Sequence, residues 1–245
     1  MYTNGYIFRY AAILVILAAA FLSLASVLLK PFQERNKAID KMEGILSAAR
    51  VEGVNATNAI PYFNKYIVEE LVINPKGDVV SNYTKSPKDE APAFKLDLKM
   101  ELYKKAHNKP YVLPLYIADK DGQKIYIIPM RGTGLWGPIW GNMALSSDLN
   151  TVIGVYFGDQ SETPGLGGEI KSAKFKDQFI GKEIFDKNGD FTSIEVVKGG
   201  VKKLPTGQRI HGVDALSGAT LTSNGVNDMI KDVLDSYLAY IKKNR

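Results

Sequence analysis

An uncharged apolar segment near the N-terminus limits what this chain can fold into more than any other feature. The 20 residues from Tyr10 to Leu29 carry no charge, and at a rise of about 1.5 Å per residue they match the roughly 30 Å hydrocarbon core of a bilayer. A cleaved signal peptide is the alternative, but its apolar region usually runs about 7 to 15 residues. Lys30-Pro31-Phe32 also stands where small residues would precede a cleavage site. The sequence therefore predicts an uncleaved transmembrane anchor over residues 1–30 and one further domain over residues 31–245.

Charge alone does not decide which side of the membrane that domain occupies. One basic residue, Arg9, precedes the span, and a cluster of basic residues follows it, namely Lys30, Arg35, Lys37 and Lys41. The positive-inside count places the large domain in the cytoplasm, whereas long domains translocate largely regardless of charge. Both orientations remain open at this point.

Composition excludes several classes of protein. With 245 residues and 45% hydrophobic content, the chain can bury a core. It contains no cysteine, which excludes disulfides, thiolate-bound iron-sulfur clusters and haem attached through Cys-x-x-Cys-His. The two histidines, His107 and His211, are too isolated to predict a metal site, and the basic residues form no block that would bind nucleic acid. Any redox chemistry would need an organic cofactor.

Hydrophobic periodicity predicts an α+β fold with a largely antiparallel sheet flanked by helices. Residues 111–130 read as two apolar runs joined through Asp121-Gly122, a pair typical of a tight hairpin turn. Further strands are expected at Thr151–Phe157 and Thr192–Val197.

Two helices and one loop complete this prediction. Between Val226 and Ile241, apolar residues recur at alternating steps of three and one, which predicts a long amphipathic helix. Another amphipathic helix is expected directly after the span, over residues 32–49. The stretch Ser81–Pro92 is polar, charged and carries two prolines, so it predicts an exposed loop.

A glycine-rich stretch follows the predicted hairpin. Gly132–Gly137 matches the G-x-G-x-x-G pattern that binds dinucleotides when a helix opens at the glycines. Here Trp136 and a proline follow, and the next strand is too near for a crossover helix. We interpret the stretch as a loop in which glycines let aromatic side chains pack closely. Trp136 and Trp140 remain candidates for stacking on a planar ring.

Two further stretches allow both a functional and a plain structural interpretation. Glu162–Glu169 is rich in glycine, so it can bring amides close to an anion or a flat ring, or simply connect two elements. Leu166 in this loop would suit contact with an aromatic ring. His211–Val226 leads into the C-terminal helix, where Ser223 or Asn224 fits the N-cap. The same place is a natural phosphate site, and composition does not separate the two.

One motif within that last stretch resembles a known modification signal. Asp214-Ala215-Leu216-Ser217-Gly218-Ala219-Thr220 resembles the flavinylation motif of the FMN-binding domain family. In that family a flavin transferase joins the FMN phosphate to the last threonine, so the resemblance implies covalent FMN on Thr220. It also implies that two other loops contact the flavin, because Glu162–Gly167 and Gly134–Gly137 resemble further family hallmarks. The cofactor-binding residues implied are Thr220, Ser217, Gly218, Ala219, Asp214, Thr163, Gly165, Leu166, Gly167 and Trp136, with no catalytic acid or base and no metal.

Within this family, Ser217–Val226 is most similar to the C subunits of sodium-translocating NADH:quinone oxidoreductases. The resemblance implies a flavoprotein of the bacterial inner membrane, with its domain in the periplasm, that relays electrons between redox centres of neighbouring subunits and has no independent activity. The span carries no charge, so we expect sodium to cross elsewhere. The G subunit of the related Rnf complex and an anchored extracytoplasmic sensor or binding domain are the alternatives. Gly167-Gly168-Glu169 and the long insert before residue 110 favour the sodium pump.

Overall fold

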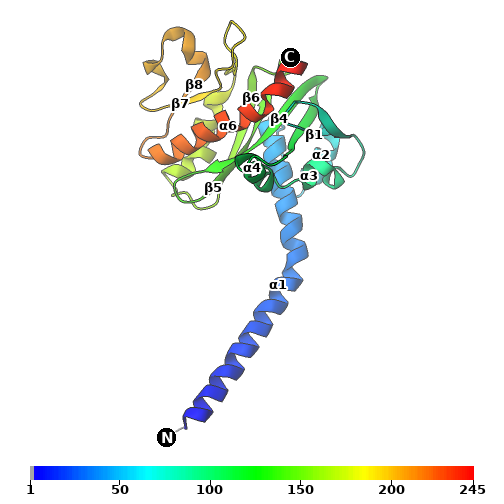
Figure 1. Ribbon diagram of the computed structural model, residues 1–245, viewed down its shortest axis with the longest axis vertical. Coiled ribbons are helices and arrows are strands. Elements are labelled where there is room, and N and C mark those ends of the chain that lie inside the picture. Colours follow the sequence, from blue (N-terminus) through cyan, green and yellow to red (C-terminus); the bar gives the residue numbers. More distant parts are fainter. Residues whose placement is uncertain (1–2) are drawn as a thin grey trace. The chain divides into compact units, whose positions relative to one another are not determined.

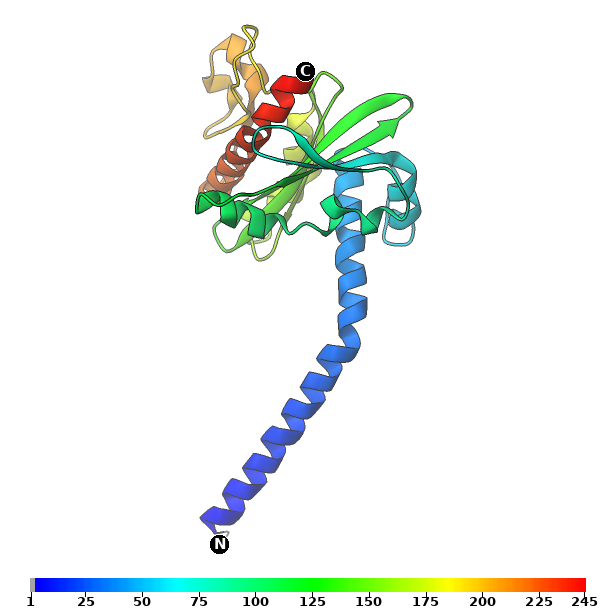
Figure 2. The same cartoon turned by 45° about the vertical axis from the view of Figure 1, so that its right-hand side comes forward.

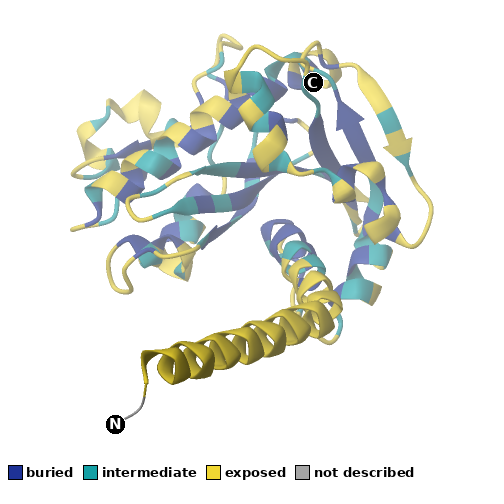
Figure 3. Ribbon diagram, turned by 60° about the horizontal axis from the view of Figure 1, so that its bottom comes forward, coloured by how far each residue is buried: buried dark blue, intermediate teal, exposed yellow. Residues whose placement is uncertain are grey.

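The computed structural model describes residues 3–245, which divide into a unit ending at Lys41 and a second unit, Met42–Arg245. The first unit belongs to a single long helix, α1 (Asn4–Ala48). Residues 3–37 are exposed, as Figure 3 shows in yellow. A stretch of α1 has a mean hydropathy of 2.8, so the helix is long and apolar enough to cross a membrane.

The second unit is built on a six-stranded sheet in which every neighbouring pair is antiparallel (Figure 1). The strand order is β2-β1-β3-β4-β5-β6. The strands are β1 (Ile67–Ile73), β2 (Val79–Tyr83), β3 (Leu113–Lys120), β4 (Gln123–Thr133), β5 (Pro138–Leu145) and β6 (Val152–Asp159). The predicted α+β fold with a largely antiparallel sheet is confirmed.

The turn between β3 and β4 forms where the sequence predicts it. Lys120 pairs with Gln123 across a two-residue turn, and Asp121 and Gly122 have φ values of 56° and 79°. Positive φ at both central residues is the geometry that suits the right-handed twist of the flanking strands. The Asp-Gly pair therefore fixes the register of this hairpin.

Helices cover both faces of the sheet, which explains why β3 is buried over six consecutive residues. The long helix α6 (Thr220–Asn244) packs along β4, as both views show (Figures 1 and 2). Its buried side chains include Val226, Met229, Ile230, Val233, Leu234, Tyr237 and Ile241, which confirms most of the predicted apolar stripe. On the other face, Phe63 contacts Phe94 and Tyr116.

Shorter helices complete the second unit. Between α1 and β3 the chain forms α2 (Ala59–Tyr66), η1 (Lys88–Glu90), α3 (Pro92–Lys95) and α4 (Leu98–Ala106). After β6 come η2 (Gly167–Lys171), α5 (Ala173–Lys176), η3 (Asp177–Phe179), η4 (Val201–Lys203) and η5 (Thr206–His211). A parallel pair, β7 (Glu195–Val197) and β8 (Gly212–Asp214), belongs to this region.

Three boundaries differ from the sequence prediction. The strand expected from Thr192 begins only at Glu195, because Ser193 has a φ of 61°. In the stretch expected as an exposed loop, Ser81–Tyr83 belongs to β2, and Lys88 is buried with its Nζ donating to the Val68 carbonyl at 3.1 Å. The C-terminal helix begins at Thr220, so Ser223 and Asn224 lie inside it and neither is the N-cap.

Candidate functional site

The three sequence motifs meet at one end of the sheet. We name them the tryptophan turn (Gly134–Gly137), the glutamate loop (Glu162–Gly167) and the threonine turn (Asp214–Thr220). The tryptophan turn connects β4 to β5, the glutamate loop follows β6, and the threonine turn leads into α6. Because Thr133 pairs with Pro138 and Ile139 with Asp159, the first two necessarily leave the sheet at the same end.

The tryptophan turn is a hairpin turn in which the Gly134 amide donates to the Gly137 carbonyl at 2.8 Å. A strand, and not a helix, follows the glycines, so the turn lacks the helix that opens at the glycines of a dinucleotide fingerprint. Trp136 is 65% exposed. Trp140 lies in β5, and its indole packs so closely on Gly158 that a Cβ there would lie 2.5 Å from Nε1. Of the two tryptophans, Trp136 is the one whose ring stands out from the surface.

The buried carboxylate of Glu162 joins the glutamate loop to the tryptophan turn and to the first turn of α6, directly after the threonine turn. One oxygen accepts the Trp136 amide at 2.8 Å, and the other accepts the Thr222 hydroxyl at 2.6 Å. The Glu162 amide in turn donates to Asp159 Oδ1 at 3.0 Å. The first turn of α6 and the tryptophan turn are therefore held to opposite oxygens of one side chain.

Glycines make this close approach possible. A Cβ at Gly134 or at Gly167 would overlap the Glu162 carboxylate, and a Cβ at Gly225 of α6 would overlap the Thr133 carbonyl. None of these three glycines has a positive φ. Space, and not backbone conformation, is what requires glycine at these positions.

Thr220 is the first residue of α6 and is half-buried. The preceding Ala219 offers no side-chain cap, so the first amides of the helix are available to another acceptor, and the positive end of the helix dipole lies there. Ser223 does not cap them either, because its hydroxyl accepts the Leu216 amide at 3.0 Å. Gly218, with a φ of 74°, lets the turn pass over Leu166: a Cβ there would lie 3.0 Å from Leu166 Cδ2.

Asp214, the first residue of the threonine turn, is held by contacts to η3 and η4. Its carboxylate accepts the Val201 amide at 2.6 Å, and its own amide donates to Gln178 Oε1 at 2.8 Å. These contacts tie the motif to η4 and η3.

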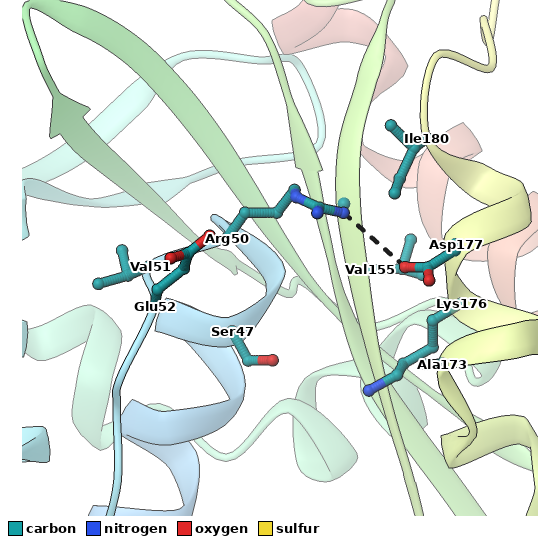
Figure 4. Close-up of a pocket in the computed structure, with 10 residues that line it drawn as sticks. Ser47, Arg50, Val51, Glu52, Val155, Ala173, Lys176, Asp177 and Ile180 are labelled. Atoms are coloured by element: carbon teal, nitrogen blue, oxygen red, sulfur yellow. Dashed lines mark ion pairs between the residues drawn. The ribbon is translucent and has the colours of Figure 1, made fainter.

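A cavity of about 540 Å³ lies between the glutamate loop and the threonine turn. Its lining comprises Gly165, Leu166, Glu169, Ser172, Lys174, Phe175, Gln178, Asp214, Ala215, Leu216 and Ser217. A second hollow, of about 190 Å³, lies where Arg50 pairs with Asp177 at 3.8 Å (Figure 4). None of the residues that line it belongs to a motif. The larger one falls in the roughly 300–1,000 Å³ range of small-molecule sites, as do two others of about 480 and 460 Å³. The position of the larger cavity between two of the motifs, rather than its size, makes it the candidate.

Sequence reasoning did not single out four features of this site. Large apolar side chains are exposed on the tryptophan turn, the glutamate loop and the first turn of α6, namely Leu135, Trp136, Leu166 and Leu221. Of these, Leu135 and Leu221 were not predicted, and neither were the hydrogen-bonding roles of Glu162 and Thr222. A leucine within or directly after a glycine-containing loop motif is the sequence signal that would have indicated Leu135 and Leu221.

The site lies within a recognisable domain. A family model described as the FMN-binding domain matches residues 134–235. The C subunit of the Na(+)-translocating NADH-quinone reductase of Pseudomonas aeruginosa is 33% identical to this chain, over 95% of this chain and 94% of that protein. The chain belongs to the family of these C subunits.

Other members agree with this assignment. The C subunit of the same reductase from Vibrio anguillarum is 36% identical over 87% of this chain and 83% of its own length. The crystal structure of the C subunit from Parabacteroides distasonis is similar with a TM-score of 0.74 and 37% identity, covering 87% of this chain and 96% of that one. NqrC of Shewanella oneidensis gives a TM-score of 0.67 at 28% identity, covering 85% and 98%.

The described residues fit FMN. The exposed apolar side chains offer contact to a flat ring, the start of α6 offers free amides to a phosphate, and the cavity beside Ser217 is large enough to admit part of the cofactor. The Thr220 hydroxyl stands at the start of that helix. This end of the sheet therefore carries the groups that an FMN-binding domain needs to hold the ring and the phosphate.

Proposed function

We propose that this chain carries FMN as a phosphoester on Thr220 and relays electrons between redox centres of neighbouring subunits in a Na(+)-translocating NADH:quinone reductase. The observation that supports this most directly is the position of Thr220. It begins α6 at the point where the tryptophan turn and the glutamate loop converge.

The chain's own residues have three tasks in this proposal. The amides and dipole of the first turn of α6 stabilise the phosphate charge next to Thr220. Trp136 and Leu166, together with Thr163 and Gly165 of the glutamate loop, form the surface for the ring, while Gly167 is buried and packs against the Glu162 carboxylate. Bound FMN supplies the electron chemistry, so no acid or base residue is needed.

We further propose that residues 1–30 anchor the chain by a single span in the bacterial inner membrane and that residues 31–245 lie in the periplasm. The partners are the other subunits of the reductase and, during maturation, a flavin transferase that recognises Asp214, Ser217, Gly218 and Ala219 with the acceptor. Sodium crosses elsewhere, because Tyr10–Leu29 contains no charged residue. Membership in the family of C subunits disfavours the Rnf G subunit and an anchored extracytoplasmic sensor or binding domain.

Intact mass tests the covalent attachment. The full chain is co-expressed with its flavin transferase, and the mass is compared with those of Thr220→Ala and of a control, Thr206→Ala, at an exposed threonine of η5. We expect wild type and control to gain the mass of one esterified FMN and Thr220→Ala to gain none. An unmodified wild type, with the transferase active on another substrate, refutes the proposal.

A further inference from the structure

Glu162 has an environment that an ordinary loop connection does not require. Its side chain is 6% exposed, although it lies in a loop whose next four residues are all exposed. Burying a carboxylate is unfavourable unless hydrogen bonds compensate it. Here two donors from different parts of the chain reach it, the Trp136 amide at 2.8 Å and the Thr222 hydroxyl at 2.6 Å.

Those two donors belong to the segments that carry the proposed flavin contacts. Trp136 is the exposed aromatic residue of the tryptophan turn, and Thr222 lies two residues after Thr220 in the first turn of α6. Glu162 itself begins the loop that carries Leu166. One side chain therefore sets the spacing between the tryptophan turn, the glutamate loop and the start of α6.

We propose that Glu162 is the positioning residue of the flavin site and that its buried negative charge makes the bound flavin harder to reduce. This inference rests on the proposed function. The positioning follows from the two hydrogen bonds, which hold Trp136 and the Thr220 turn in one arrangement before the cofactor arrives. The effect on potential follows from Coulomb's law, since a negative charge in a poorly solvated region opposes the addition of an electron nearby.

Two substitutions separate position from charge. In Glu162→Gln, the side-chain carbonyl still accepts the Trp136 amide and the NH₂ group donates to the Thr222 oxygen, so the geometry is kept and the charge is lost. Glu162→Ala removes both contacts, so the buried Thr222 hydroxyl and the part-buried Trp136 amide lose this partner. Glu195→Ala is the control, because Glu195 is exposed in β7 and lies outside the site.

The full-length variants are co-expressed with the flavin transferase. Intact mass then gives the fraction that carries FMN, and a redox titration gives the midpoint potential of the bound flavin. In protein made without the transferase, hydrogen exchange is measured for the peptide that contains Trp136. We expect Glu162→Gln to load like wild type and to have a more positive potential. For Glu162→Ala we expect loading about tenfold slower, a change of about 1.4 kcal/mol, because the Trp136 amide and the Thr222 hydroxyl lose their shared partner. We also expect faster exchange at Trp136. Glu195→Ala should match wild type throughout.

The outcomes distinguish this inference from the proposed function. If wild type itself gains no FMN, the proposed function fails and the role of Glu162 fails with it. If wild type loads, but Glu162→Gln keeps the wild-type potential and Glu162→Ala loads at the wild-type rate, the inference alone is wrong. If the Glu162→Ala chain does not fold, Glu162→Gln decides. An unchanged flavin potential in Glu162→Gln would refute the charge effect. Failure of Glu162→Gln to load FMN would refute the expected retention of geometry.

Discussion

The packing around Glu162 predicts that Gly167→Ala is strongly destabilising although alanine suits the backbone there. A Cβ at Gly167 would overlap Glu162 Oε2 and lie 2.5 Å from Thr222 Oγ1, and these two atoms are joined by a 2.6 Å hydrogen bond. The methyl group must separate them. Losing a hydrogen bond to a charged group costs about 1.5–3 kcal/mol, and overpacking costs about 1–3 kcal/mol. We expect the free energy of unfolding to fall by about 3 kcal/mol, which lowers Tm by roughly 6–12 °C in a domain of this size.

Thermal unfolding followed by tryptophan fluorescence measures this effect, since the fluorophores Trp136 and Trp140 both lie near the site. Gly207→Ala is the matched control, because a Cβ there meets nothing within 4 Å and Gly207 has no positive φ. If Gly167→Ala melts within about 2 °C of Gly207→Ala, the glutamate loop adjusts to the added methyl group without a loss of stability. The close packing around Glu162 would then contribute little to the free energy of unfolding.

Three further predictions concern the core. Tyr237→Phe should cost about 1 kcal/mol in chemical denaturation, because the buried hydroxyl donates to the Pro114 carbonyl at 2.6 Å. Lys88→Met should cost about 3 kcal/mol, because it removes the buried cation that faces fully buried Glu70, and Glu70→Gln in the same chain should restore part of the loss. Burial raises the pKa of Tyr240 to about 12 in the folded protein, whereas the unfolded phenol ionises near pH 10. The stabilisation by buried, neutral Tyr240 is therefore complete below about pH 10 and is lost as pH rises towards 12. Tyr240→Phe should therefore make the free energy of unfolding fall less steeply between these pH values.

Local sequence signals predicted the elements whose stability depends on near neighbours in the chain. The β3–β4 hairpin was predicted because Asp121-Gly122 adopts positive φ without help from the rest of the fold. The apolar face of α6 was predicted because its spacing alone defines one side of a helix. In contrast, β1 and β5 were missed: β1 places two glutamates inside an apolar run, and β5 contains a proline and a glycine, so pairing with long-range neighbours decides their conformation.

The start of α6 shows why the site itself was only partly predicted. Ser223 has the side chain of an N-cap, but in the folded chain its hydroxyl accepts the Leu216 amide, so the helix extends back to Thr220. Glu162 was part of a recognised motif, yet its partners are 26 and 60 residues away. No local pattern identifies partners at such separations.

The topology of the sheet explains why motifs so far apart in sequence form one site. In an antiparallel order β4-β5-β6, the turn after β4 and the end of β6 must lie at the same end of the sheet, and the pairs Thr133–Pro138 and Ile139–Asp159 place them there. The start of α6 reaches the same end because Gly225 allows its backbone to approach the Thr133 carbonyl. Strand order therefore brings the segments together, glycines let them approach, and the Glu162 carboxylate fixes their spacing. Changes in strand pairing should disrupt folding as a whole, whereas changes at Glu162 and Gly167 should act first on the arrangement around Thr220.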